Sequence, residues 1–150
     1  MQAYLTWGIG FGKHKELAQI NAQLDARLDK IKVEKLEKLE IPLCNVYENK
    51  KELENLKGNY KGIVLQNCAK GEVASALVLC FCENKIIIGH GKAGGAIKAE
   101  NIAKFKAFKL LTDQKLKENM EQRIIITAHA PPQKDTYGCA IVALIFKNEG

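Results

Sequence analysis

The sequence predicts a single α+β domain over residues 1–150, built as a layered sandwich of mainly antiparallel sheets flanked by helices. With 150 residues, 47% of them hydrophobic, the chain is long enough to bury one core without staples. Strand-like and helix-like segments follow in the order strand, helix, several strands, helix and two strands, which is typical of helices packed on sheet faces. The segment 136–147 is apolar on both faces and has small residues at Gly138, Ala140 and Ala143. This pattern predicts a central strand that another layer approaches closely.

The first element is a strand over 3–12, which we expect to run into a glycine-rich turn. Gly8, Gly10 and Gly12 have neither the spacing of a dinucleotide-binding loop nor the Gly-Lys-Ser/Thr of a phosphate loop. We therefore interpret them as a flexible strand end. From Lys13 onwards, apolar residues recur every three or four positions and predict an amphipathic helix. Its core-facing stripe would consist of Leu17, Ile20, Leu24, Leu28 and Ile31.

The period of the next segment is ambiguous. Apolar and charged residues alternate over 31–34 as in a strand, whereas Val33, Leu36 and Leu39 would continue a helix, and Pro42 stops either. We predict a strand over 32–39. Residues 42–45 are then a turn or loop, and 48–57 form a charged connector, helical or irregular, that closes at a Gly-Asn pair.

The second half of the chain alternates strands with glycine-containing connections. We predict strands over 60–68 and 72–83, and a hairpin partner for the second of these over 85–88. A glycine-rich loop over 89–95 follows, and loops of this kind beside strand ends are common places for functional sites. It opens onto a helix over 97–112, whose large side chains include Ile97, Phe105, Phe108, Leu110 and Leu111, with Asn101 among them. A strand over 123–129 ends at two prolines and forms a hairpin with the last strand.

Composition excludes several classes of protein. No apolar run approaches the roughly 18 residues that cross a bilayer, so a membrane-spanning protein is excluded. The net charge is +6, but the lysines are interleaved with glutamates over 32–40, which indicates a solvated face rather than a nucleic-acid footprint. Five cysteines are an odd number, mostly within apolar runs, and no leader precedes the first strand. We therefore expect a reducing, cytoplasmic environment.

The residues that could carry chemistry are few. Cys80 and Cys82 would share one face of a strand, but a metal site needs two further ligands, so buried thiols are the better interpretation. His90, in the glycine-rich loop, and His129, at a strand end, could each act as an acid or base. The single serine, Ser75, lies in the middle of a predicted buried strand. No Ser-His-Asp set can therefore be composed.

In order and spacing, these segments together resemble the pyruvoyl-dependent arginine decarboxylase family. The resemblance covers nearly the whole chain: the first strand with its glycines, the helix residues 17–24, the strand leading to Ile41-Pro42, the segment 71–76, and the last strand over 137–146. The last strand is the most specific match. Members of this family fold as a sandwich of sheets flanked by helices and form trimers with the active site between neighbouring subunits.

The resemblance also implies a reaction. Members cut themselves at a Ser-Ser pair, and the second serine becomes a pyruvoyl group. This ketone forms a Schiff base with the substrate amine and acts as the electron sink for loss of carbon dioxide.

The sequence departs from the family at three roles. The place of the Ser-Ser pair corresponds to 37–39, Glu-Lys-Leu, which contains no serine or threonine. The glutamate proton donor falls near Ile88, where His90 is the nearest replacement. The aspartate that meets the guanidinium of arginine corresponds to Asn21, whose amide would bind that cation less well.

The resemblance thus implies an uncleaved, inactive homologue that forms a homotrimer or higher oligomer and binds a small ligand or a partner between subunits. Its ligand-binding residues would be Asn21, Lys38, Gly89 and Gly91. No cofactor is expected, because a pyruvoyl group would arise only by self-cleavage. The alternative is an active, arginine-type amino-acid decarboxylase with catalytic residues Cys44, as the ketone precursor, and His90, or one completed by a paralogous subunit. A third possibility is a structural subunit that stabilises an active paralogue.

Overall fold

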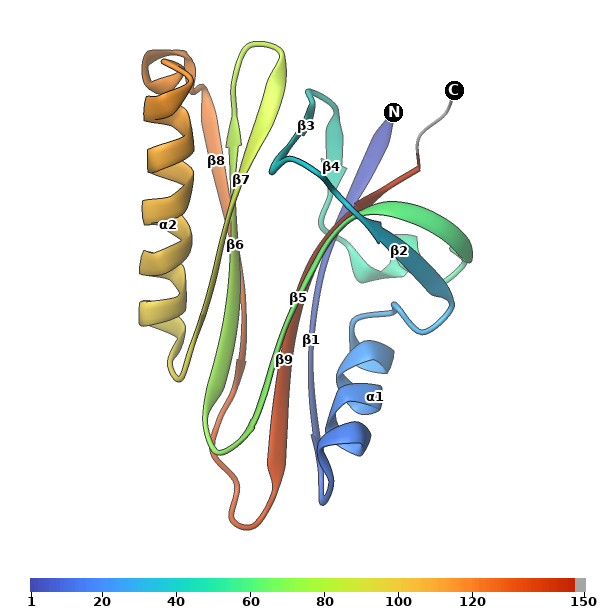
Figure 1. Ribbon diagram of the computed structural model, residues 1–150. Coiled ribbons are helices and arrows are strands. Elements are labelled where there is room, and N and C mark those ends of the chain that lie inside the picture. The colour runs from blue at the N-terminus through green and yellow to red at the C-terminus, as the bar shows by residue number, and fades with distance from the viewer. Residues whose placement is uncertain (148–150) are drawn as a thin grey trace.

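The computed structural model describes residues 1–147. Two sheets lie face to face and one helix covers the outer face of each, so the layers run helix, sheet, sheet, helix (Figure 1). The predicted α+β class with two stacked, helix-flanked sheets is therefore confirmed. Within residues 1–147 no helix is both long and apolar enough to cross a membrane.

The five-stranded sheet has the order β2-β5-β9-β1-β4 and is mostly antiparallel, with β2 and β4 added in parallel. Its strands are β1 (Gln2–Gly12), β2 (Ile31–Lys35), β4 (Asn45–Tyr47), β5 (Gly58–Lys70) and β9 (Tyr137–Phe146). Helix α1 (Lys15–Asp25) covers its outer face.

The four-stranded sheet has the order β3-β7-β6-β8 and is antiparallel throughout. Its strands are β3 (Glu40–Pro42), β6 (Val73–Phe81), β7 (Lys85–Ala93) and β8 (Gln122–Ala130). Helix α2 (Ala96–Asp113) covers its outer face, and two short 3-10 helices, η1 (Lys50–Leu53) and η2 (Lys117–Asn119), lie in connections.

The last strand is central, as the sequence predicts. Strand β9 is the third of five and pairs with β1 on one side and β5 on the other. Its even-numbered residues, such as Val142 and Leu144, pack between the two sheets, and its odd-numbered residues, such as Ile141 and Ile145, pack under α1. The side chain of Ser75 is fully buried and donates a hydrogen bond to the carbonyl oxygen of Ala140 at 2.9 Å, which ties the two sheets together.

The two glycine-rich segments are strands, which corrects the predicted turn after 3–12 and the predicted loop over 89–95. A Cβ on Gly10 would lie 2.2 Å from the backbone nitrogen of Ala22, and one on Gly91 would lie 2.3 Å from the carbonyl oxygen of Ala99. Glycine is needed there because the helix backbones approach the strands closely. Only Gly94 and Gly95 lie in the short connection between β7 and α2.

The core-facing side of α1 also differs from the prediction. Alanines are the fully buried residues of both helices: Ala18 and Ala22 in α1, and Ala99, Ala103 and Ala107 in α2, where Leu111 is also buried. Three residues of the predicted stripe face solvent, with Leu17, Ile20 and Leu24 44%, 53% and 48% exposed. Leu28 is buried as predicted and Ile31 packs against the same cluster, but both lie beyond the end of α1 at Asp25. On α2, Ile97, Phe105 and Phe108 are likewise exposed. Small residues occupy the inner faces of the helices because larger side chains would not fit against the glycine-containing strands.

Several connections were also predicted differently. Strand β2 ends at Lys35, and a bend over 36–39 replaces the rest of the predicted strand. The predicted loop over 42–45 contains the end of β3 and the start of β4. Strands β8 and β9 do not form a hairpin, because they belong to different sheets and their connection crosses between the layers.

The cysteines differ in state. A disulfide joins Cys68 to Cys139, which lie opposite each other on β5 and β9, a pairing that the expected reducing environment did not predict. Cys80 and Cys82 are buried free thiols under α2, in agreement with their predicted role as small apolar residues. Cys44 is free and half-buried.

Candidate functional site

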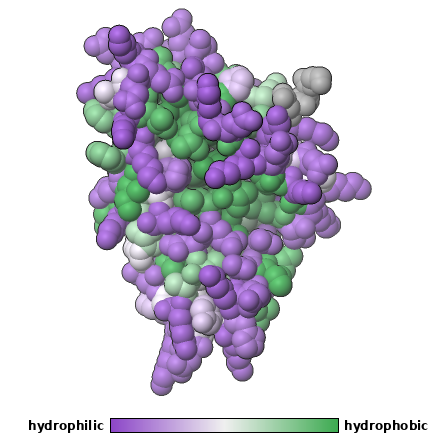
Figure 2. Space-filling model, viewed as in Figure 1, coloured by the Kyte–Doolittle hydropathy of each residue, from purple (hydrophilic) through white to green (hydrophobic). Residues whose placement is uncertain are grey.

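At one edge of the sandwich, parts of β5 and β7 have no paired strand on their outer side. Strand β3 pairs with β7 only up to Ile87, and β2 pairs with β5 only up to Gly62. Beyond these points neither strand pairs with another strand on its outer side among residues 1–147, although the backbone nitrogen of Ile88 still donates to the carbonyl oxygen of Leu39. Figure 2 looks onto an edge of the sandwich and shows hydrophobic residues in the middle with hydrophilic residues around them. We call this the β5/β7 opening.

His90 faces this opening. Along β7, Ile86 and Ile88 pack between the sheets, and His90 and Lys92 follow on the same face because side chains alternate along a strand. The Nζ of Lys92 donates to the carbonyl oxygen of Gln66 on β5 at 3.3 Å, which spans the two sheets. His90 is half-buried.

The imidazole of His90 is surrounded by positive charge. Burial lowers its pKa, and the ammonium groups of Lys106, Lys35 and Lys92 lower that pKa further. The Nζ of Lys106 lies 3.4 Å from Nδ1 of His90. Because an ammonium group has only donors, Nδ1 accepts and the proton of the neutral ring is on Nε2. The neutral ring can therefore donate a hydrogen bond from Nε2 to a group in the opening.

The bend over 36–39 passes beside the same opening and carries Lys38. The nitrogen of Leu36 donates to the carbonyl oxygen of Gly62, and the carbonyl oxygen of Leu39 accepts from the nitrogen of Ile88 at 2.9 Å. The bend thus connects the two sheets next to β7. Lys38 is exposed on it.

Gly89 and Gly91, predicted as ligand-binding residues, lie on the opposite face of β7 from His90. A Cβ at either position would collide with the backbone of α2. Their role in the described residues is close packing of the helix rather than contact with the opening.

Asn21 lies on α1, outside the five-stranded sheet. Its amide donates to the carbonyl oxygen of Phe11 at 2.7 Å, which fastens the helix to β1. A complete sheet separates it from the face of β7 that carries His90. One chain therefore does not bring these two predicted site residues together.

Cys44 lies at the other edge of the sandwich, where β4 and β8 are the terminal strands of their sheets. It lines a hollow of about 680 Å³ with residues that include Leu43, Phe81, Gln122 and Ile124. Burial raises the pKa of its thiol, which leaves it mostly protonated and weakly nucleophilic at neutral pH. Cys44 and His90, the two predicted catalytic residues, are not brought together within one chain.

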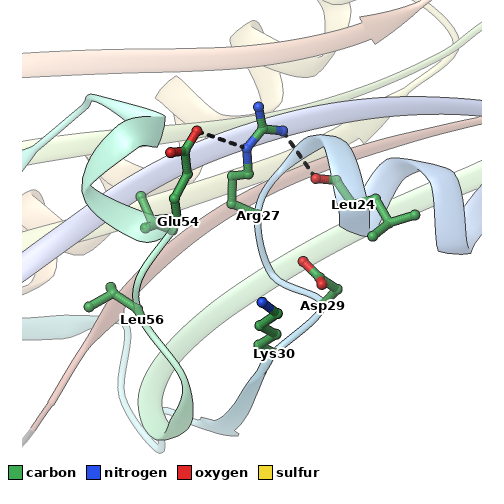
Figure 3. A pocket seen from close by; sticks show the side chains of 7 residues that line it. Leu24, Arg27, Asp29, Lys30, Glu54 and Leu56 are labelled. Atoms are coloured by element: carbon green, nitrogen blue, oxygen red, sulfur yellow. Dashed lines mark hydrogen bonds and ion pairs between the residues drawn. The ribbon is translucent and has the colours of Figure 1, made fainter.

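A smaller hollow of about 250 Å³ lies at the end of α1, with Leu24 and Leu56 among its lining residues (Figure 3). Arg27 dominates it, with a left-handed backbone at φ 63°. Its Nη1 donates to the carbonyl oxygen of Leu24 at 3.1 Å, and its Nε lies 3.8 Å from Oε1 of Glu54. The guanidinium group of Arg27 thus donates a hydrogen bond to a carbonyl oxygen at the end of α1 and lies near the carboxylate of Glu54. The polar groups of this hollow therefore have a structural role.

The residues of the candidate site that sequence reasoning did not single out are the lysines around His90. Lys92 could have been found from its position two residues after His90. Lys35 and Lys106 come from β2 and α2, and only the folded arrangement brings them to the same edge. Comparison with models of protein families and with curated proteins found no match to this chain. The chemistry of the opening must therefore be inferred from its side chains.

Proposed function

We propose that this protein is a pyruvoyl-dependent arginine decarboxylase-like protein that remains uncleaved and catalytically inactive, and that it binds a small ligand or a partner at pockets between the subunits of a homotrimer. The order and spacing of the motifs along nearly the whole chain support this proposal. The layered arrangement of two sheets flanked by helices agrees with the sandwich that the resemblance implies.

The observation that carries the proposal is the chemistry of the bend over 36–39. This segment matches the self-cleavage site and lies beside β7, to which Leu39 is hydrogen-bonded. The side chains of Glu37, Lys38 and Leu39 have no hydroxyl or thiol from which a pyruvoyl ketone could arise. Without that ketone the family's electron sink is missing.

The separation of Asn21 from His90 supports a pocket between subunits. A pocket that uses both residues requires two chains, since a sheet divides them within one. The exposed Leu17, Ile20 and Leu24 on the helix of Asn21 offer a contact surface. Burying these half-exposed side chains would contribute roughly 1 kcal/mol each.

The mass of the intact purified protein tests the proposal. We expect one chain of 16.7 kDa, no carbonyl-reactive terminus, and no release of carbon dioxide from arginine. Two fragments, one of which carries a ketone at its new terminus, would overturn it.

The alternative, an active amino-acid decarboxylase, uses Cys44 as the precursor or a paralogous subunit. Cys44 is the free thiol nearest in sequence to the bend, although it lies at the edge opposite His90. Release of carbon dioxide from arginine and other amino acids, with and without any co-purifying relative, separates the two functions. Activity that a Cys44→Ala variant loses would favour the alternative.

A further inference from the structure

Three lysines from three different elements converge on one histidine at the β5/β7 opening. Lys35 ends β2 opposite Gly62 of β5, Lys92 is on β7, and Lys106 is on α2. Each acts on the charge state of His90. The long side chain of Lys106 reaches His90 although α2 covers the other face of the sheet.

These lysines differ from others in the chain because no carboxylate neutralises them. Lys85 pairs with Glu40 at 2.9 Å, and Lys50 lies 3.7 Å from Asp25. Within residues 1–147, none of Lys35, Lys92 and Lys106 forms an ion pair with an acidic side chain. Gathering like charges without a counter-charge is unfavourable, and a bound anion would reverse that effect.

The opening also offers donors and an apolar surface. A lysine ammonium group is a mobile point charge that suits phosphate and carboxylate oxygens, and the Nε2 proton of His90 adds a directional donor. Beside Lys35, a separate hollow of about 220 Å³ lies along β2 and β5, with Val33, Ile63 and Val64 as its apolar lining residues.

We propose that the β5/β7 opening is an anion-binding site in which Lys35, Lys92 and Lys106 surround a phosphate or carboxylate group that accepts a hydrogen bond from His90. This inference rests on the proposed function, because it names the ligand class of the opening beside the uncleaved bend. The site then has the opposite charge preference from a pocket for a guanidinium group, and arginine is excluded from the position beside His90.

The test is a titration of the full chain with inorganic phosphate and, separately, with succinate, followed by nuclear magnetic resonance of the histidine ring protons. His14 and His129 serve as internal references. We expect a saturable shift of the His90 signal towards its protonated position with at least one anion, because the anion offsets the three ammonium groups. The anion that binds with the lower dissociation constant shows whether the site prefers phosphate or carboxylate.

Lys106→Gln should weaken this binding about tenfold, the loss expected for one charged hydrogen bond. Lys92→Gln provides a second variant should the first fail to fold, and Lys106→Arg should restore binding. The matched control is Lys98→Gln, an exposed lysine of the same helix, which changes net charge equally and should alter the affinity less than twofold.

The inference is overturned if neither anion moves the His90 signal, if Lys98→Gln weakens binding as much as Lys106→Gln, or if arginine moves the signal in preference to both anions. Failure of anion binding with an intact chain would leave the proposed uncleaved homologue standing. Anion binding by a chain that is found cut would support the anion-binding site and overturn the proposed uncleaved homologue.

Discussion

Replacing Gly91 by alanine places a methyl group where α2 already lies against β7. The added Cβ would be 2.3 Å from the carbonyl oxygen of Ala99 and 2.8 Å from the nitrogen of Ala103. The first distance is about 1 Å shorter than ordinary van der Waals contact, and both atoms belong to the helix backbone, so no rotamer change can relieve the collision. The helix must move away from the sheet as a unit.

Overpacking in a core costs about 1–3 kcal/mol, and we expect the upper end, about 3 kcal/mol, because the colliding atoms are rigid. For a chain of this length that corresponds to a Tm lower by about 6–12 °C. The matched control is Gly94→Ala, whose Cβ would meet nothing nearer than the carbonyl oxygen of Glu72 at 3.7 Å. It should leave the free energy of unfolding unchanged or raise it by up to about 1 kcal/mol.

Urea denaturation of the two variants and the parent measures these differences. If Gly91→Ala lowers the free energy of unfolding by less than about 1 kcal/mol, the close helix approach is not what requires glycine. If it instead weakens ligand binding at unchanged stability, Gly91 takes part in ligand binding, as the resemblance implied.

Three further outcomes are expected. The pKa of His90 is lowered by burial and by neighbouring lysines, so below about pH 6.5 the unfolded chain binds more protons than the folded chain, and the free energy of unfolding should fall as the pH falls through that range. A His90→Gln variant should lose less stability than the parent between pH 7.5 and 5.5. Equal losses in the two proteins would contradict the assignment of this effect to His90. Ile20→Lys should shift the proposed oligomer towards monomers in sedimentation, whereas Gln23→Lys on the same helix should not; an unchanged association state after Ile20→Lys would remove α1 from the proposed interface. The disulfide closes a loop of 71 residues, so its reduction should lower the free energy of unfolding by up to about 4 kcal/mol; alkylation of all five cysteines in unreduced, denatured protein would show that it does not form.

The architecture could be predicted where the residue pattern within one segment was sufficient to identify its structure. Strand β9 is apolar on both faces, which only a central position explains, and both helices were recognised from their apolar spacing. Three residues of the inner stripe predicted for α1 face solvent, because periodicity favours large side chains whereas close contact with the sheet requires small ones. A usable signal was present: glycines two apart in β1 and β7 match alanines four apart in α1 and α2, the periods of a strand and a helix in close contact.

The candidate site was less predictable for a physical reason. His90 could be singled out, but its environment depends on where β2 ends and on which side of α2 Lys106 lies. Both are properties of the packed layers. The segment with Gly89 and Gly91 was predicted as a loop rather than a strand because glycine serves tight turns and close packing equally well, and a short sequence window does not separate the two.

The glycine–alanine contacts confine change to the outside of the molecule. At Gly10, Gly91 and the alanines facing them, any larger side chain pushes the layers apart, so these positions tolerate almost no substitution. The outward faces of α1 and α2 carry no such restriction. Mutations during evolution could therefore change the exposed side chains of the helices while the two sheets stay the same. Homologues could then acquire different binding partners without a change of fold.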